Sequence, residues 1–191
     1  MTVITDRRVS ENFWLSEVIR SETADREGID NLPPPSVLRL IETLTCPGLE
    51  RTRVELGRRG MYPTSFYRCP ELNCMVGGAM TRDSLQDVLL TTMINSVRTR
   101  AQQRLSDGRF GESNSGHMSG LAVDFTCPGF GSPKAICEAL EKVKHLILYD
   151  QLIHEFGNWV HIAFAEQPRL MPLTIDRFGT RHGILDIRLT I

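Results

Sequence analysis

Apolar residues recur every three or four positions in three segments of this chain, which is the spacing of helices that pack one face on a core. These segments cover residues 36–57, 81–108 and 132–148. The stripes that we expect to be buried are Val37, Leu40, Ile41 and Leu44 in the first segment, Leu85, Val88, Leu89, Met93 and Val97 in the second, and Ile136, Leu140, Val143 and Leu146 or Ile147 in the third. The pattern therefore predicts core-facing helices, the second of them with a single apolar stripe.

Capping and helix-breaking residues indicate where these helices start and stop. Ser16 is a suitable N-cap for a short N-terminal helix over "LSEVIRSE", and Ser36 heads the next helix after the rigid connector "NLPPP". Pro47 has no backbone N–H, so it is expected to kink or end that helix, or to open a second one. The run 106–108, Ser-Asp-Gly, is expected to end the helix whose last turns are rich in arginine.

Towards the C-terminal end of the sequence, the composition changes to that of strands. The segment "DQLIHEFGNWVHIAF" (150–164) has strand composition on both sides of a Gly-Asn pair and is predicted to be a hairpin. The alternating stretch "HGILDIRLTI" (182–191) is expected to be a further strand, whereas residues 62–80 are expected to be rich in loops. Helices first and strands later, without regular alternation, predict an α+β domain.

Composition and charge exclude several classes of protein. At 191 residues the chain suits a single domain, and its 22 basic and 23 acidic residues give no reason to expect nucleic acid as a partner. No run of about 18 apolar residues predicts a membrane span, and the first residues lack the apolar core of a signal peptide. We therefore expect synthesis in the cytoplasm, with free, buried thiols at the five cysteines. The oligomeric state stays open.

The candidate chemistry begins at "SGHMSGLAVDF" (115–125), where His117 and Asp124 stand seven residues apart across two glycines. That spacing does not fit one face of a helix, so the pair predicts a loop that leads into a short strand. In the second strand of the hairpin, alternation puts His161 on the face opposite to Val160 and Ile162. Two histidines and one carboxylate, with an open coordination position, are the composition of a catalytic zinc site.

The length of the hairpin loop decides which neighbour accompanies His161. A two-residue loop would put His154 opposite His161, whereas a three-residue loop would pair Glu155 with Trp159 and put Glu155 on the metal face. We favour the longer loop because it supplies a carboxylate base for a water at the metal. It requires a left-handed residue in the loop, and Asn158 at the third position tolerates that conformation.

Several of these motifs together resemble a known family. "SGHMSGLAVDF" resembles the SxHxxGxAxD signature of the M15 zinc peptidases, the D-alanyl-D-alanine carboxypeptidase-like family, and "WVHIAF" (159–164) is similar to its second zinc-binding motif. "TSFYRCPELNCMVGGA" (64–79) is similar to the family's SGYRSxxxN…GGA segment, and residues 12–38 resemble the leader of its phage-associated branch. The matches occur in the family's order and cover about two thirds of the chain.

The resemblance implies a role for each matching position. The implied zinc ligands are His117, Asp124 and His161. Glu155 would be the general base that takes a proton from the attacking water and passes it to the leaving amine. Arg68 would hold a substrate carboxylate, because a guanidinium binds that group through two parallel hydrogen bonds. Ser115 would brace the first motif, and Gly120 would allow close backbone packing. Trp159 departs from the family pattern and is a further candidate for contact with the substrate, the alternative being ordinary packing in the hairpin.

The resemblance also implies a fold and an activity. The expected fold is hedgehog/DD-peptidase-like, with a small antiparallel sheet that carries the zinc site and helices packed on it. The expected substrates are peptidoglycan stem peptides, cut as a D-Ala-D-Ala carboxypeptidase or as an endolysin-type endopeptidase at the cell wall. The alternative is a zinc-containing protein without catalysis, which binds the cell wall or forms part of a virion.

Three departures from the family pattern separate this chain from its relatives. Phe66 replaces a glycine, and Trp159 stands where some relatives carry a second histidine near the metal. About 35 residues, 80–114, separate "GGA" from "SGH", where phage-type relatives often have a few. This insert would be a lid, a partner-docking element or a helix that only enlarges the core.

Overall fold

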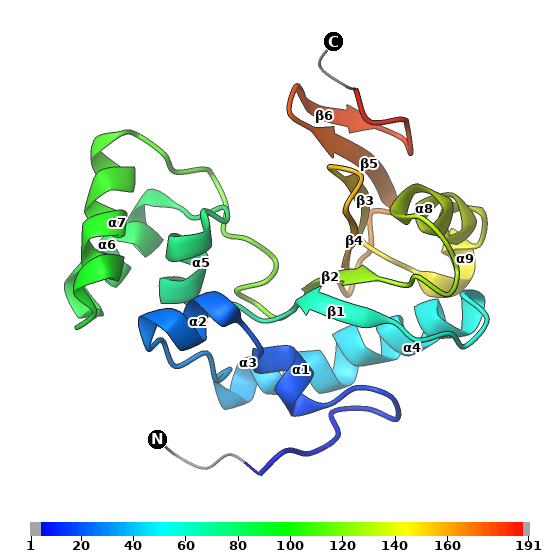
Figure 1. Cartoon of the computed structure of the whole chain (residues 1–191), viewed down its shortest axis with the longest axis horizontal. Coiled ribbons are helices and arrows are strands. Elements are labelled where there is room, and N and C mark those ends of the chain that lie inside the picture. Colours follow the sequence, from blue (N-terminus) through cyan, green and yellow to red (C-terminus); the bar gives the residue numbers. More distant parts are fainter. Residues whose placement is uncertain (1–4, 189–191) are drawn as a thin grey trace.

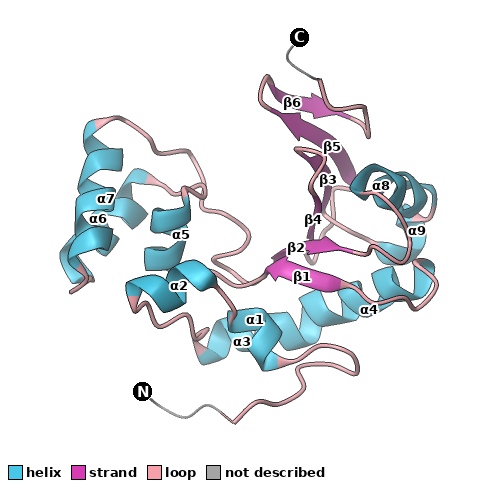
Figure 2. Cartoon of the chain, in the orientation of Figure 1, coloured by secondary structure: helices cyan, strands magenta, loops and turns pink. Residues whose placement is uncertain are grey.

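The computed structural model describes residues 5–188, in which helices surround one open sheet of six strands (Figures 1 and 2). The strand order is β1-β2-β4-β3-β5-β6. Neighbouring strands are antiparallel except for β3 and β5, which are parallel, so the sheet is mixed rather than antiparallel throughout. The strands are β1 Tyr62–Ser65, β2 Ala122–Thr126, β3 Gln151–Glu155, β4 Trp159–Ala163, β5 Met171–Asp176 and β6 Gly179–His182. This architecture agrees with the predicted α+β class.

The helices lie in three groups around the sheet, with α2, α5, α6 and α7 at one end of the molecule, α8 and α9 at the other, and α1, α3 and α4 below β1 in the view of Figure 1. None of them, within residues 5–188, is long and apolar enough to cross a membrane. The helices are α1 Leu15–Ile19, α2 Glu22–Glu27, α3 Pro35–Leu40, the π-helix η1 Ile41–Thr45, α4 Cys46–Glu55, α5 Pro70–Val76, α6 Arg82–Thr91, α7 Asn95–Ser106, α8 Pro133–Lys142 and α9 Lys144–Ile147.

The two faces of the central strands differ in polarity, as alternation in β4 predicts. Val160 and Ile162 are fully buried in the core, and α8 packs against β3 and β4. Helix α4 approaches the end of β4 at Gly48, where an added Cβ would lie 2.2 Å from the ring of Phe164. The opposite face of the same strands carries His161 and the cavity described below. One face is therefore core and the other is available for a site.

The first predicted helix forms, and Pro47 lies in the first turn of the later helix α4, in agreement with the alternative that it opens a second helix. Helix α3 begins at Pro35 rather than Ser36 and continues through η1 into α4, with Pro47 as the second residue of α4. At the junction, Cys46 N–H donates to the carbonyl of Ile41, five residues back. In a π-turn each N–H donates to the carbonyl five residues back instead of four, so the hydrogen-bond pattern shifts at this junction. The helix therefore tolerates the missing N–H of Pro47 here.

The N-terminal capping prediction is wrong. Trp14, not Ser16, occupies the N-cap position of α1, and the Glu17 carboxylate accepts the Trp14 backbone N–H at 2.9 Å. Ser16 lies inside the helix, and its hydroxyl donates to Asp6 Oδ2 at 2.8 Å. The reciprocal glutamate of a capping box therefore fixes this helix start without a hydroxyl cap.

The segment 81–108 forms two helices rather than one. Thr92 adopts an extended conformation with φ −70° and ψ 138°, which ends α6, and its hydroxyl accepts the N–H of Ile94 just before α7. Met93, expected in the core, is 88% exposed at this turn, while Leu85 and Val97 are buried. The helix does end at Ser106, as predicted. Both helices pack on α5.

Other parts of the chain hold more regular structure than their pattern indicated. Residues 62–80 contain β1 and α5, and the third stripe breaks at Val143 into α8 and α9. The strand expected at 182–191 is wrong over the described residues: β6 ends at His182, no strand covers 183–188, and 189–191 lie outside the described range. All five cysteines are free and buried, as predicted.

Candidate metal centre and cavity

Two neighbouring strands and one loop bring His117, Asp124 and His161 together. Asp124 on β2 pairs directly with His161 on β4, and cross-strand partners in an antiparallel pair have neighbouring side chains. His117 lies in the turn that precedes β2. That turn closes through Gly120, which has φ +70°, and an added Cβ there would lie 2.6 Å from Ile41. Glycine at this position therefore permits both the left-handed backbone and the close approach of the helix.

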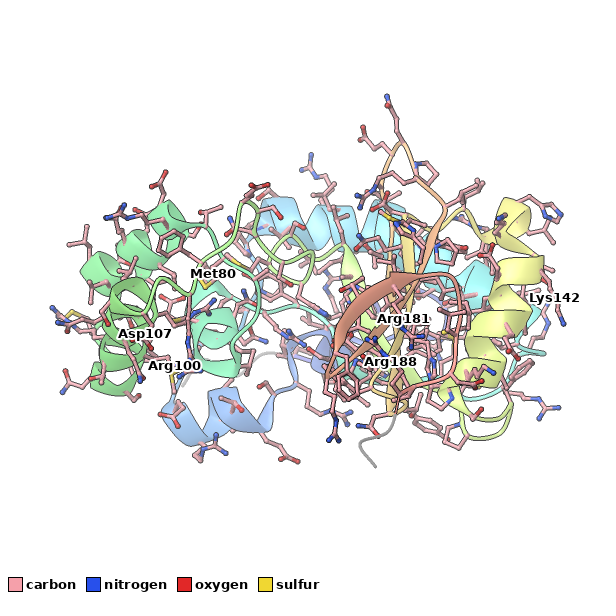
Figure 3. All side chains as sticks on the ribbon, turned by 90° about the horizontal axis from the view of Figure 1, so that it is seen from above. Met80, Arg100, Asp107, Lys142, Arg181 and Arg188 are labelled. Atoms are coloured by element: carbon pink, nitrogen blue, oxygen red, sulfur yellow. The ribbon has the colours of Figure 1, made fainter. Side chains whose placement is uncertain are left out.

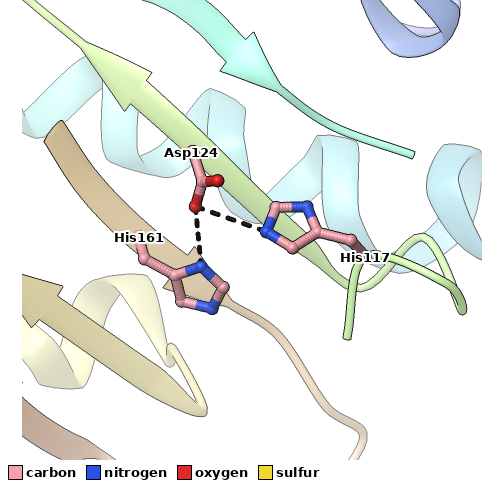
Figure 4. Close-up of side chains that lie close together, drawn as sticks. All are labelled: His117, Asp124 and His161. Atoms are coloured by element: carbon pink, nitrogen blue, oxygen red, sulfur yellow. Dashed lines mark hydrogen bonds and ion pairs between the residues drawn. The ribbon is translucent and has the colours of Figure 1, made fainter. Parts of the chain in front are cut away.

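The three side chains converge on the Asp124 carboxylate (Figure 4). His161 Nδ1 lies 2.7 Å from Asp124 Oδ1, and His117 Nε2 lies 3.3 Å from the same oxygen. The two imidazole rings are edge to face, with centroids 5.1 Å apart. One ligand atom from each residue lies within 4.8 Å of the other two. This buried group can hold a metal ion.

Contacts behind the cluster orient its members. His117 Nδ1 lies 2.6 Å from the carbonyl oxygen of Phe66. Because a carbonyl only accepts hydrogen bonds, this nitrogen carries the proton and Nε2 presents its lone pair to the cluster. Arg68 Nη2 donates to Asp124 Oδ2 at 2.9 Å, and its Nε donates to Ser65 Oγ at 2.7 Å. A metal ligand braced from behind in this way is typical of protein metal sites.

Burial and hydrogen bonding set the protonation states of the cluster. Burial lowers the pKa of His117, which favours the neutral, ligating form of the ring. Burial alone would raise the pKa of Asp124, but its contacts with His117 and His161 outweigh burial and hold that pKa well below its usual range. The cluster therefore presents a carboxylate and a neutral imidazole, which are the forms that bind divalent metals.

The hairpin beside the cluster adopts the predicted three-residue loop. Glu155 pairs with Trp159, so both side chains lie on the face of His161. The left-handed residues are Phe156 and Gly157, with φ +51° and +75°, and not Asn158 as predicted. The Asn158 N–H donates to the Glu155 carbonyl at 3.1 Å and closes a four-residue turn. Positive φ at the two central positions of such a turn matches the twist of the strands.

Glu155 is held next to the cluster in a low-dielectric position. Burial raises its pKa, and the nearby His161 partly opposes that shift. Trp159 Nε1 donates to Glu155 Oε2 at 3.1 Å, which orients the carboxylate along the strand. A carboxylate whose pKa rises towards neutrality accepts and returns a proton more readily than an exposed one.

All of the predicted site residues line one cavity of about 570 Å³, which we call the metal cavity. Its volume is within the range of small-molecule sites. Backbone of the segment 77–79 forms one wall, and Phe156 and Ile175 contribute apolar surface. The predicted residues that meet here are Arg68, Ser115, His117, Asp124, Glu155, Trp159 and His161.

Ser115 braces the turn that carries His117, and the remaining three histidines do not line the metal cavity. The Ser115 hydroxyl accepts the backbone N–H of His117 at 3.3 Å, and its carbonyl accepts that of Met118, so it braces the turn. His154 points away from the cluster, with Nδ1 3.0 Å from the Leu185 carbonyl. His145 and His182 are exposed.

Three features of the site were not found from the sequence. The carbonyl of Phe66 is a backbone atom, so the type of side chain does not indicate its contact with His117. Ile175, which lines the cavity, belongs to β5, and the sequence pattern did not predict that strand. The contact between Arg68 and Asp124 was also missed, since nothing in the spacing of the two residues indicates that they meet.

The donor set fits zinc. Two imidazole nitrogens and one carboxylate oxygen leave a fourth position open, and tetrahedral bonds of about 2.0–2.2 Å separate ligand atoms by roughly 3.3 Å. The His117 Nε2–Asp124 Oδ1 distance of 3.3 Å matches that separation. The shorter 2.7 Å contact from His161 is a hydrogen bond, which a small rotation of the ring would open. Comparison with protein-family models, curated proteins and solved structures gave no match.

Proposed function

We propose that this protein is a zinc-dependent peptidase that hydrolyses D-amino-acid-containing bonds of peptidoglycan stem peptides. One observation carries the proposal: a buried His117–Asp124–His161 group shares a cavity with Glu155, a half-buried carboxylate outside the ligand set. A metal ligand set with an open position beside a potential base is the arrangement of hydrolytic zinc enzymes. The substrate class follows from the resemblance of the sequence motifs to the M15 zinc peptidases.

The ligands would be His117, Asp124 and His161, and the bound zinc would supply Lewis-acid polarisation of the scissile carbonyl. Glu155 accepts a proton from the attacking water, whose oxygen bonds to the carbonyl carbon. The carbon–nitrogen bond then breaks, and Glu155 returns the proton to the leaving amine, so one water is consumed for each bond cut. The raised pKa of Glu155 suits both halves of this transfer.

Arg68 and Trp159 would position the substrate at the edge of the metal cavity. Arg68 uses Nε and Nη2 for Ser65 and Asp124, which leaves Nη1 for a polar group of the peptide. Trp159 is held by its hydrogen bond to Glu155, so its indole forms a fixed apolar wall. These contacts would orient the scissile bond relative to Glu155.

Replacement of the proposed base tests the function. Glu155→Ala is expected to lower the rate of cleavage of a synthetic stem pentapeptide by about 10²–10⁴-fold, the range for loss of a general base. Zinc content, measured by atomic absorption, should stay at the wild-type value because Glu155 is not a ligand. Glu138→Ala, on the exposed side of α8 where Glu138 pairs with Lys134, is the matched control and should leave the rate unchanged.

Two results would count against this account. An unchanged rate in Glu155→Ala, with the wild type active, would remove Glu155 from the mechanism. Zinc bound by the wild type without cleavage of stem peptides or intact sacculi would favour the alternative of a zinc-containing wall-binding protein.

A further inference from the structure

A second cavity of about 610 Å³ lies next to the metal cavity, and we call it the outer cavity. Its walls come from the junction of α1 and α2, from β1 and from α5. Arg68 and Val76 line both cavities, so the two spaces meet at these residues. The site is therefore one part of a longer cleft that continues away from the hairpin.

Arg68 stands at the junction instead of closing the far end of the cleft. Its Nε and Nη2 donate to Ser65 and Asp124, so the guanidinium is tied to the strands that carry these two residues. An enzyme that removes one terminal residue needs a cation at a closed end, where it binds the free carboxylate. Here, space large enough for a drug-sized ligand lies on each side of the cation.

The outer cavity has the lining of a peptide-binding surface. Arg20 contributes a cation, and its Nη2 is anchored to the Pro63 carbonyl at 2.9 Å. Hydroxyls of Thr23 and Thr64 and the ring of Tyr67 add polar and apolar surface. Such a mixture suits an extended peptide that carries a carboxylate, because backbone groups need hydrogen-bond partners and the carboxylate needs a cation.

We infer that the substrate runs from the metal cavity past Arg68 into the outer cavity, which makes the protein an endopeptidase for crosslinked stem peptides. This inference rests on the proposed function, of which it specifies the substrate class. The internal carbon–nitrogen bond breaks, the water oxygen bonds to the acyl carbon, and the proton goes to the leaving amine. Both products are then peptides, and no free amino acid is released.

Two defined peptides and two arginine variants test this inference. The zinc-loaded full chain is incubated with a linear pentapeptide that ends in D-Ala-D-Ala and with a crosslinked dimer of stem peptides, and products are identified by mass spectrometry. The wild type should cut the dimer with a kcat/KM at least about 10-fold higher than that for the pentapeptide, because only the dimer fills both cavities.

Arg20→Glu should lower the dimer-to-pentapeptide ratio of kcat/KM by about 10-fold, the effect of losing one charge-assisted hydrogen bond. Arg26→Glu makes the same charge change at the exposed end of α2, where Arg26 lines neither cavity, and should keep the wild-type ratio. Calorimetry adds a readout without turnover: Arg20→Glu in the Glu155→Ala background should weaken dimer binding, whereas Arg26→Glu should not. Thermal unfolding checks that each variant is folded.

The outcomes separate this inference from the proposed function. Release of free D-alanine from the pentapeptide, with the dimer left intact, would overturn the endopeptidase assignment and leave the peptidase standing. If Arg20→Glu keeps both the wild-type dimer-to-pentapeptide ratio of kcat/KM and the wild-type affinity for the dimer, the outer cavity does not bind the substrate. Hydrolysis of neither peptide would overturn both proposals.

Discussion

Asp124 and Asp176 are both buried aspartates, 5% and 3% exposed, yet they lie in very different surroundings. Asp124 occupies the middle of the sheet and is contacted by His117, His161 and one guanidinium. Asp176 ends β5, where Arg181 Nη2 and Arg188 Nη2 donate to it at 3.0 and 2.7 Å. Figure 3 shows these two arginines close together beside the C-terminal hairpin.

The difference between the two clusters lies in what their partners can still bind. A guanidinium has donors only, so the arginines around Asp176 neutralise the carboxylate and offer no lone pair to a metal. A neutral imidazole offers a lone pair, and the cluster around Asp124 opens on a cavity of about 570 Å³. A buried carboxylate therefore becomes a candidate metal ligand through its histidine neighbours and the open space, and burial by itself does not make it one.

The largest expected effect is a loss of zinc affinity when Asp124, but not Asp176, is replaced. Asp124→Ala should weaken zinc binding by more than about 100-fold, because a change even to a partner behind a ligand costs roughly 10–100-fold. Asp176→Ala should leave the affinity at the wild-type value. Competition with a chromogenic chelator measures both, and equal losses in the two variants would contradict the distinction.

A smaller effect is expected from the arginine behind each carboxylate. Arg68→Ala should weaken zinc binding by about 10-fold or somewhat more, since Asp124 Oδ2 loses the donor that orients it. Arg188→Ala removes a comparable contact to Asp176 and should not change the affinity. The same chelator competition applies, and an unaffected Arg68→Ala would show that the cluster does not need this brace.

Asp176→Asn is expected to have the smallest effect on metal binding. It should instead change how the stability of the fold depends on acid pH. The hydrogen bond from Arg188 lowers the pKa of Asp176. The ionised group thus adds stability above about pH 4, the ordinary range of an unfolded aspartate, and this stability is lost as the pH falls towards the lower folded pKa. Asp176→Asn should lower the unfolding temperature at pH 7 and flatten its fall between about pH 4 and pH 2. Scanning calorimetry across that range measures both, and a wild-type profile would contradict the role of the ion pair.

The site was predictable from the sequence to a greater extent than the fold around it. Alternation in β4 placed His161 opposite to Val160, and the pairing of Glu155 with Trp159 follows from a three-residue loop. Both inferences depend on local geometry, which short strands obey strictly. The left-handed positions within the loop were assigned wrongly, because Phe156 carries no sequence signal for positive φ.

The parts that could not be predicted depend on tertiary contacts or on backbone atoms. The break between α6 and α7 places an apolar Met93 in solvent, against the periodicity that predicts one continuous stripe. The parallel pairing of β5 with β3 joins distant segments and leaves no local pattern. The Phe66 carbonyl that fixes His117 is common to every residue type, so no side chain could indicate it.

The insert predicted at 80–114 comprises α6, α7 and their connections, and one arginine ties it to the wall of the metal cavity. Arg104 is buried and donates to the carbonyls of Cys74, Gly78 and Arg109. Gly78 belongs to the wall of the metal cavity, and an added Cβ there would lie 2.0 Å from Asn73 Oδ1. The contacts of Arg104 indicate a role that the sequence analysis did not consider for this segment, the support of the cleft wall.

The central claim is that the His117–Asp124–His161 group, and not the Asp176 cluster, is a metal centre. X-ray diffraction from zinc-loaded crystals, recorded on both sides of the zinc absorption edge, tests it most directly. The account predicts one anomalous peak per chain, within about 2.0–2.2 Å of His117 Nε2, an oxygen of Asp124 and a nitrogen of His161. A peak elsewhere in the chain, or no peak at a saturating zinc concentration, would contradict it.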